Sequence, residues 1–267
     1  MTKIIVTGAA GRMGQRIIAN ICADKNLKLV GAIEHAGHAA LGKDAGSLAG
    51  CGDCGVLITS DLNAAVALGD VVIDFTAPST TVPHLEIVAK LQKAIVIGST
   101  GHNDEQKKQI ADYSKKIPIV MASNMSVGVN VMWKIIADAA KLLGNAFDIE
   151  VLEAHHKLKK DAPSGTAMTT GEVLAQATGR DLAKDAVYHR EGLIGERKPN
   201  EIGIQTIRGG DVVGDHTVFF LGNGERLEIT HRATSRDTFA MGALRAATWV
   251  VGKSPKLYHM KDVLGLS

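Results

Sequence analysis

Residues 3–14 of this chain are Lys3-Ile4-Ile5-Val6-Thr7-Gly8-Ala9-Ala10-Gly11-Arg12-Met13-Gly14. The apolar run at the start of this stretch predicts a buried β-strand, and glycines follow it at once with the spacing G-x-x-G-x-x-G. This spacing departs from the G-x-G-x-x-G form, but it meets the same physical needs. These needs are a tight turn, a close backbone approach to a pyrophosphate, and close packing of the following helix. The stretch therefore predicts a dinucleotide-binding loop.

The residues after this loop support the same prediction. Residues 12–23 have the apolar spacing of an amphipathic helix, and residues 27–33 form a second apolar run that ends at Glu34. Glu34 lies 20 residues beyond Gly14, where an acidic side chain accepts hydrogen bonds from the adenosine ribose. A turn that binds nothing is the alternative, because glycine-rich loops alone are weak evidence of a nucleotide site.

The first half of the chain alternates apolar runs with helical patterns. The further runs that we expect to be strands are residues 71–75, 94–97 and 118–122. Such alternation predicts a Rossmann-type, doubly wound α/β fold, with a parallel sheet covered by helices on both faces and ligands at the carboxyl ends of the strands. The small and hydroxyl residues expected at these ends, near a nicotinamide ribose, are Gly98, Ser99, Thr100, Ala122, Ser123, Asn124 and Met125.

The pattern changes after Ser126. The segments expected next are a helix at 129–143, a strand at 147–154, a helix at 166–178, and strands at 202–208, 212–221 and 226–231. Successive strands without helices between them predict a second, α+β domain with a mixed or antiparallel sheet. Residues 236–253 return to a helical pattern that we expect to pack on the first domain. We therefore expect a dinucleotide-binding domain of residues 1–126 and 236–267, and a substrate-binding and oligomerisation domain of residues 127–235.

A second motif concentrates acid/base and anion-binding groups. It is Glu153-Ala154-His155-His156-Lys157-Leu158-Lys159-Lys160-Asp161-Ala162-Pro163-Ser164-Gly165-Thr166. Adjacent histidines on a strand point to opposite sides, so one can face a reacting group while the other binds something else. Ser164 is placed to cap a helix whose free N–H groups would bind a carboxylate or phosphate. The motif predicts an active site for an anionic substrate, with a basic surface loop as the alternative.

Composition limits the classes of partner. Among 267 residues, 30 basic and 28 acidic side chains give a net charge of +2, which does not favour nucleic acid or a membrane surface as a partner. No apolar run approaches the roughly 20 residues of a bilayer span, and the loop at residue 8 leaves no room for a signal peptide. We expect a cytoplasmic enzyme that acts on a small anion.

The cysteines could contribute to a metal site. They are Cys22, Cys51 and Cys54. Their odd number argues against a disulfide framework. His35 and His38 with Cys51 and Cys54 would supply four zinc-type ligands. Residues 39–50 have the composition of an ordinary loop, however, and a histidine pair followed by a cysteine pair is not diagnostic, so we predict no metal site.

The combination of motifs resembles the dihydrodipicolinate reductase family, also called the 4-hydroxy-tetrahydrodipicolinate reductases, over nearly the whole chain. The residues that carry the resemblance are Glu153 to Thr166, Gly8 to Gly14, Ser126-Val127-Gly128-Val129-Asn130, Arg208-Gly209-Gly210-Asp211 and Ile229-Thr230-His231-Arg232. The resemblance implies NAD(P)H-dependent reduction of a small dicarboxylate in lysine and diaminopimelate biosynthesis. It also implies a homotetramer assembled through the sheet of the second domain.

The resemblance also implies residue roles. It assigns acid/base catalysis to His155 and Lys159, and substrate binding to His156, Gly165 and Thr166. The cofactor contacts that it implies are Gly8, Ala9, Ala10, Gly11, Arg12, Met13, Glu34, Gly98, Ser99, Thr100, Ala122, Ser123, Asn124 and Met125.

Two positions depart from the family pattern and bear on the choice of cofactor. His35 and Ala77 stand where some members carry arginines, and Glu34 would repel a 2′-phosphate. We therefore expect NADH to be preferred, or used at least as well as NADPH, although Arg12 could turn toward a 2′-phosphate.

Two other functions remain open at this point. An amino-acid or diamine dehydrogenase of similar plan could keep the N-terminal loop, but it should lack the histidine pair, Lys159 and the Ser-Gly-Thr turn. A binding protein that senses the dinucleotide would bind it without turnover.

Other histidines are expected at the surface or in loops: His84, His102, His189 and His259. Trp133 and Trp249 are expected in the core.

Overall fold

The computed structural model describes residues 1–266, and the chain divides into two compact units. The first unit consists of Met1–Val127 and the segment from Arg236 onward, and the second is Gly128–Ser235. Each unit has its own sheet, and we describe the units separately.

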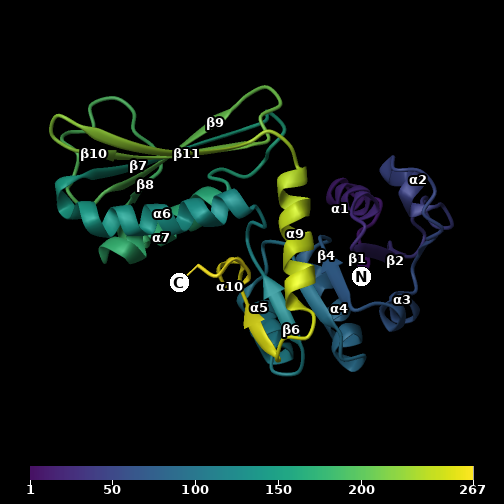
Figure 1. Ribbon diagram of the computed structural model, residues 1–267. Helices are drawn as coiled ribbons and strands as arrows, with labels where there is room; N and C mark the ends of the chain where they lie inside the picture. The colour runs from purple at the N-terminus through teal and green to yellow at the C-terminus, as the bar shows by residue number, and fades with distance from the viewer. Residues whose placement is uncertain (267) are drawn as a thin grey trace. The chain divides into compact units, whose positions relative to one another are not determined.

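The sheet of the first unit is parallel, with the strand order β12-β6-β5-β4-β1-β2-β3 (Figure 1). Its strands are β1 (Thr2–Thr7), β2 (Leu27–Ile33), β3 (Ile58–Thr59), β4 (Val71–Asp74), β5 (Ala94–Ile97), β6 (Pro118–Met121) and β12 (Lys256–Tyr258). Strand β1 pairs with β2 on one side and with β4 on the other. The strand order therefore reverses beside β1, which is where open α/β sheets bind their ligands.

Helices cover both faces of this sheet. They are α1 (Arg12–Ala23), α2 (Ala45–Ala49), α3 (Leu62–Leu68), α4 (Pro78–Lys90), α5 (Asp104–Tyr113), α9 (Asp237–Val250) and α10 (Met260–Leu264). Successive strand residues point to opposite faces, so Ile4 and Val6 lie in a core with α1 and α9, whereas Ile5 lies in a second core with α3, α4 and α5. The prediction of a doubly wound parallel sheet is confirmed.

The second unit has a mixed sheet, and this prediction is also confirmed. The strand order is β11-β10-β7-β9-β8, with β7 antiparallel to β10 and parallel to β9. The strands are β7 (Asp148–His155), β8 (Ala186–Val187), β9 (Ile202–Arg208), β10 (Gly214–Leu221) and β11 (Arg226–Ala233). The helices are α6 (Val127–Leu143), α7 (Gly165–Thr178) and α8 (Leu182–Asp185), with a 3₁₀ turn at Gly144–Ala146. Helices α6 and α7 run along one face, where they enclose a core around Phe220 (Figure 1).

The short elements that were not predicted from the sequence include two strands and one helix of the first unit. Strands β3 and β12 add one strand to each edge of the parallel sheet. Residues 39–50, expected to be a loop, contain helix α2, which the Asp44 carboxylate caps by accepting hydrogen bonds from Gly46 N and Ser47 N. The loop assignment is therefore wrong at Ala45–Ala49.

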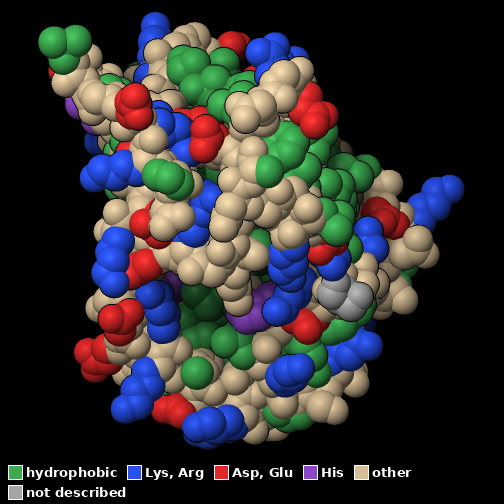
Figure 2. Space-filling view, turned by 90° about the vertical axis from the view of Figure 1, so that its left-hand side faces the viewer, with side chains coloured by type: hydrophobic (Ala, Val, Ile, Leu, Met, Phe, Trp, Pro, Cys, Tyr) green, Lys and Arg blue, Asp and Glu red, His purple; other side chains and the backbone are tan. Residues whose placement is uncertain are grey.

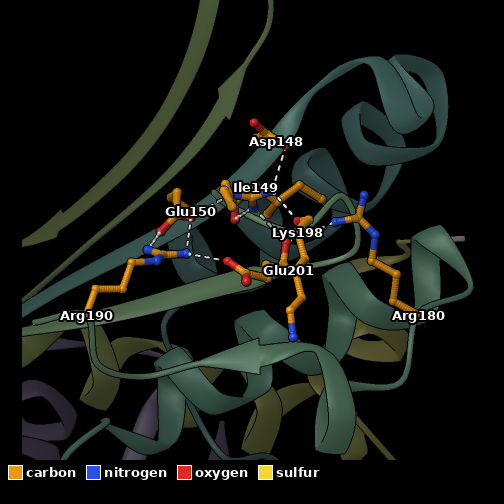
Figure 3. A network of polar contacts seen from close by, with 8 residues as sticks. Asp148, Ile149, Glu150, Arg180, Arg190, Lys198 and Glu201 are labelled. Carbon is orange, nitrogen blue, oxygen red and sulfur yellow. Dashed lines mark hydrogen bonds and ion pairs between the residues drawn. The ribbon is translucent and has the colours of Figure 1, made fainter. Parts of the chain in front are cut away.

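Arginines fasten the segment between β8 and β9 to strand β7 (Figure 3). Arg190 makes a bidentate ion pair with Glu150 at 2.8 and 2.9 Å and also contacts Glu201 at 3.1 Å. Arg197 contacts Asp148 at 2.6 Å and Glu150 at 3.1 Å. These pairs hold a long stretch that has no regular structure of its own.

Charges are mixed over the surface. Lysine and arginine side chains are interspersed with aspartate and glutamate on the face shown in Figure 2, in keeping with the net charge of +2. Within residues 1–266, no helix combines the length and hydropathy that a membrane span requires.

Candidate active site

The glycine-rich loop has the predicted geometry. Gly8 follows β1 with φ of 67°, in the left-handed region, and Gly11 N donates a hydrogen bond to Gly8 O at 3.0 Å. A Cβ at Gly14 would collide with Gly8 O and would lie 2.8 Å from Ala9 Cα. Helix α1 begins at Arg12. The glycines therefore make the tight turn and the close helix packing for which dinucleotide loops use them.

A cavity of about 590 Å³ lies beside this loop. It is at the carboxyl ends of β1, β2 and β4, within the size range of small-molecule sites. Its lining includes Gly8, Gly11, Glu34, His35, Thr76, Ala77 and His84. The Glu34 carboxylate is held there because its Oε1 accepts a hydrogen bond from Ala10 N at 2.9 Å. The cavity fits the adenosine end of a dinucleotide.

The other predicted cofactor residues occupy different surroundings. Ala9 is buried, Arg12 is exposed, and Met13 packs on the core; Met125 is also buried. Residues 98–100 and 122–125 follow β5 and β6, so they lie at the same edge of the sheet as the cavity but do not line it. Ser99 Oγ is buried and has no hydrogen-bond partner within residues 1–266. An unpaired hydroxyl at this edge fits a polar ligand.

Two histidines near this edge are less exposed than the sequence suggested. His84 Nδ1 lies 2.9 Å from Oδ2 of Asp74, a fully buried carboxylate at the end of β4. Burial opposes the charge of Asp74, but His84 and Thr76 outweigh it and lower the pKa of this carboxyl. His102 is also buried and contacts Thr81 Oγ1 at 3.0 Å. His84 lies on helix α4 and is partly buried, so the prediction is wrong for this residue. His102 lies in the loop after β5, as expected, but it is buried there.

Glu34, His35 and His38 bring potential metal-ligand atoms within 4.8 Å of one another. The hydrogen bonds of His38 oppose such a role. His38 Nδ1 accepts from Ala40 N at 3.1 Å, which places the proton of the neutral ring on Nε2 and leaves Nε2 without a lone pair for an ion.

The second motif forms a polar centre in the second unit, on the face of the sheet that carries α7. Glu153 and His155 are two residues apart on β7, so they share a face, and both are buried. His155 Nδ1 lies 2.6 Å from Glu153 Oε2. The pairing leaves Nε2 as the ring nitrogen available to a reacting group.

The Glu153 carboxylate collects donors from three other places. Ser164 N, Thr206 Oγ1 and the Arg208 guanidinium donate to it at 3.0, 3.1 and twice 2.8 Å. Burial alone would raise the pKa of Glu153, but hydrogen bonds from His155 and Arg208 outweigh it and hold that pKa well below its usual range. Glu153 is therefore a permanent anion beside His155.

His216, on β10, completes this centre. Its ring lies edge-on to that of His155, with centroids 5.3 Å apart, and its Nε2 is 3.3 Å from Ser164 Oγ. Burial, with the neighbouring His155, lowers the pKa of His216 to about 3, so this ring is neutral near pH 7. Gly214 leaves room for the His155 ring, because a Cβ at Gly214 would lie only 3.0 Å from His155 Nε2.

Lys159 lies in the loop after β7. Its Nζ contacts Asp161 Oδ2 at 3.0 Å, and its side chain is 22 % exposed. Its backbone N–H donates to His156 O at 3.1 Å. His156 follows the end of β7, where its N–H donates to Val212 O at 2.8 Å. The ammonium group of Lys159 thus belongs to the loop that directly follows the two histidines in the sequence.

Helix α7 presents its N-terminus to this centre. Ser164 is the N-cap, as predicted, and its hydroxyl accepts from Ala167 N at 3.2 Å. Gly165 has open space where a side chain would be, and Thr166 is nearly buried beside it. The first N–H groups of a helix lack intrahelical acceptors, so this end can bind an anion.

Sequence reasoning missed several residues of the centre. Glu153 was part of the motif but received no role, although its spacing of two from His155 on a strand signalled a shared face. Thr206, Arg208 and His216 come from β9 and β10, which pair with β7 at Glu153↔Thr206, His155↔Arg208 and Glu153↔His216. No local pattern reveals that register.

Comparison with known proteins bears on the whole chain. Residues 2–125 match the family model "Dihydrodipicolinate reductase, N-terminus", and residues 128–264 match "Dihydrodipicolinate reductase, C-terminus". The chain belongs to the dihydrodipicolinate reductase family. This membership confirms the resemblance and makes the chain an oxidoreductase that uses a pyridine nucleotide.

Individual relatives agree with this assignment. The chain is 58% identical to a 4-hydroxy-tetrahydrodipicolinate reductase of Geobacter sulfurreducens and 56% identical to one of Syntrophotalea carbinolica, with 100% of each chain covered. Among solved structures, it is similar to a dipicolinate-bound dihydrodipicolinate reductase from Paenisporosarcina sp. TG-14. That similarity has a TM-score of 0.75 and 25% identity, and it covers 97% of each chain.

Proposed function

We propose that this chain catalyses the NAD(P)H-dependent reduction of 4-hydroxy-tetrahydrodipicolinate to tetrahydrodipicolinate in lysine and diaminopimelate biosynthesis. The observation that carries the proposal is the placement of His155 and the N-terminus of α7 on one buried carboxylate, Glu153. The full-length match of this chain to 4-hydroxy-tetrahydrodipicolinate reductases supports the same reaction. A dicarboxylate ring needs both anion-binding N–H groups and a nearby acid.

The proposed roles follow from the chemistry of the reduction. The 4-hydroxyl group of the substrate must leave as water, which gives the ring its conjugated double bond. A reduced nicotinamide bound to the first unit would supply the hydride to that bond. The electron density that hydride addition leaves requires a proton, and we assign its delivery to His155 Nε2 and Lys159 Nζ. His156, Gly165 and Thr166 would hold the substrate carboxylates through the imidazole, the helix N–H groups and the hydroxyl. The glycine-rich loop and Glu34 would bind the cofactor.

We propose to test these roles by substituting the two proton donors. His155→Ala and Lys159→Ala should each lower kcat by roughly 10²- to 10⁴-fold, the usual contribution of general acid catalysis. The measurement is NADH oxidation with substrate made freshly from pyruvate and aspartate semialdehyde by its synthase. Lys160→Ala is the matched control, because this neighbouring lysine is exposed, and it should keep wild-type kcat. Tight NADH binding without wild-type turnover would contradict the proposal and favour a dehydrogenase for another substrate.

For the cofactor, we propose that NADH is preferred or used at least as well as NADPH. The Glu34 carboxylate lines the cavity and is held by Ala10 N, so a 2′-phosphate would meet a fixed negative charge. His35 and Ala77 line the same cavity in place of any arginine. The ratio of the two kcat/KM values should therefore favour NADH or be near one.

The variant Glu34→Gln tests the cause of this preference. It removes the charge but keeps an oxygen that can accept from Ala10 N, so it should shift the kcat/KM ratio toward NADPH. Arg12→Ala is the control for the alternative that this exposed residue binds a 2′-phosphate. A strong wild-type preference for NADPH that disappears in Arg12→Ala would overturn the proposal.

We also propose that the chain forms a homotetramer through the second sheet. The face opposite α6 and α7 carries apolar side chains on three neighbouring strands: Leu152, Ile207, Phe219 and Leu221. Ile207 is 50% exposed and Leu221 36%. Exposed apolar side chains on a sheet face favour association with another chain.

We place this enzyme in the cytoplasm. All three cysteines, Cys22, Cys51 and Cys54, are free thiols. Free thiols are typical of proteins kept in a reducing compartment, which supports this proposal.

A further inference from the structure

We propose that Glu153 is the positioning residue of His155, and that Arg208 sets how strongly this carboxylate stabilises the imidazolium. The inference rests on the proposed function, in which His155 delivers a proton to the substrate. It adds a triad built on a buried carboxylate, Arg208–Glu153–His155, whose members come from two strands paired in the sheet. Neither Glu153 nor Arg208 needs to touch the substrate in this arrangement.

The hydrogen bonds of Glu153 fix the orientation of its carboxylate. Oε1 accepts from Ser164 N, Thr206 Oγ1 and Arg208 Nη2, at 3.0, 3.1 and 2.8 Å. Oε2 accepts from Arg208 Nη1 at 2.8 Å and faces His155 Nδ1 at 2.6 Å. Because the carboxylate is fully buried, it cannot rotate without leaving at least one of these donors unpaired.

The orientation of the carboxylate decides which nitrogen of His155 can react. An ionised carboxylate is only an acceptor, so Nδ1 must carry a proton in both charge states of the ring. The imidazolium then transfers the proton on Nε2 to the substrate and becomes a neutral ring that keeps Nδ1–H. The charge of Glu153 stabilises the cationic form before transfer, as in other acid/base histidines oriented by a carboxylate.

The other groups around His155 do not replace Glu153. His216 faces the ring from β10 and is neutral, because burial lowers its pKa to about 3. In the loop after β7, Lys159 is paired with Asp161. Glu153 is therefore the carboxylate in contact with the imidazole, and Arg208 is the cation in contact with that carboxylate.

A second ion pair on the same strand shows what a purely structural pair looks like. Glu150 and Arg190 form the same bidentate contact, at 2.8 and 2.9 Å (Figure 3). Glu150 is three residues from Glu153 on β7, so the two side chains point to opposite faces of the sheet. Glu150 pairs with Arg190 and Arg197, the arginines that fasten the segment before β9. Glu150 thus matches Glu153 in strand and in type of ion pair, but it has no imidazole partner among its contacts in Figure 3.

The test uses two substitutions with opposite electrostatic effects. Glu153→Gln removes the anion that stabilises the imidazolium, so the alkaline limb of the kcat/KM profile, where the acid loses its proton, should move to lower pH by roughly one unit. Arg208→Gln leaves the anion less neutralised, so the same limb should move to higher pH. Glu150→Gln is the control and should leave the limb unchanged. The amide of this variant replaces one accepting oxygen with an NH2 group, which cannot accept a hydrogen bond from a donor that Glu153 now pairs with. Glu153→Gln should therefore also lower kcat by roughly 10²-fold, with little change in KM for NADH.

Three results would overturn the inference. The first is a limb that stays in place in both variants, and the second is a limb that moves in the same direction in both. The third is a ¹⁵N NMR spectrum of the wild type in which neutral His155 carries its proton on Nε2. If Glu153→Gln does not fold, as judged by circular dichroism, the direction of the shift in Arg208→Gln decides alone.

The outcomes separate this inference from the proposed function. If His155→Ala retains wild-type kcat, the assignment of the acid fails whatever the Glu153 variants do. If His155→Ala loses activity but the limb does not respond to Glu153→Gln and Arg208→Gln, only the positioning role fails. The NMR tautomer of His155 needs no substrate, so it tests the positioning role even if the wild type reduces a different compound.

Discussion

At the scale of single residues, His216 makes the second unit sensitive to acid. Burial lowers its pKa to about 3, against about 6.5 in an unfolded chain. Between these values the unfolded state binds more protons, so the stability contributed by the neutral ring is complete above about pH 6.5 and is lost as the pH falls toward 3. For one such site, the free energy of unfolding falls by about 1.4 kcal/mol for each pH unit in this range. Urea titrations from pH 7 to 4 should show this loss, and His216→Gln should reduce the pH dependence of the free energy of unfolding. An unchanged slope in the variant would contradict the cause.

The same residues show what could be predicted at this scale. The N-cap position of Ser164 could be predicted from one contiguous motif, because helix caps are local. The proposed roles of His155 and Lys159 rest on the family resemblance of the same motif. Arg208 and His216 could not be connected to Glu153, since strands paired across more than 50 residues have a register that no single segment encodes. The burial of His102 in its loop was missed for a related reason, because its partner Thr81 lies 21 residues away on helix α4.

At the scale of elements, length decided which predictions succeeded. Long strands such as β2 and β10 and helices such as α1 and α9 carry enough residues for their apolar period to be recognised. Strands β3 and β12 have two and three residues, too few for any period, and the parallel sheet itself supplies their hydrogen bonds. Helix α2, with five residues, is equally short, but its signals were present. Asp44 accepts from four backbone N–H groups around it, and Gly50 ends the helix with φ of 78°.

At the scale of the whole molecule, the proposed tetramer predicts that stability depends on protein concentration. Ile207 is half exposed on the outer face of the second sheet, and an interface there would bury it. Ile207→Lys would place an unpaired charge in that interface, which costs several kcal/mol. Light scattering should therefore give four chains for the wild type and a smaller particle for the variant. The melting temperature of Ile207→Lys should also be lower than that of the wild type, because association stabilises only the folded chains.

The matched control for this prediction is Leu68→Lys. Leu68 is 62% exposed at the end of α3 in the first unit, so it presents an apolar side chain of comparable exposure away from the second sheet. The control should keep both the wild-type mass and the wild-type melting temperature. A wild-type protein that scatters as a single chain at micromolar concentration would contradict the tetramer. An Ile207→Lys protein that keeps four chains would place the interface on a different surface.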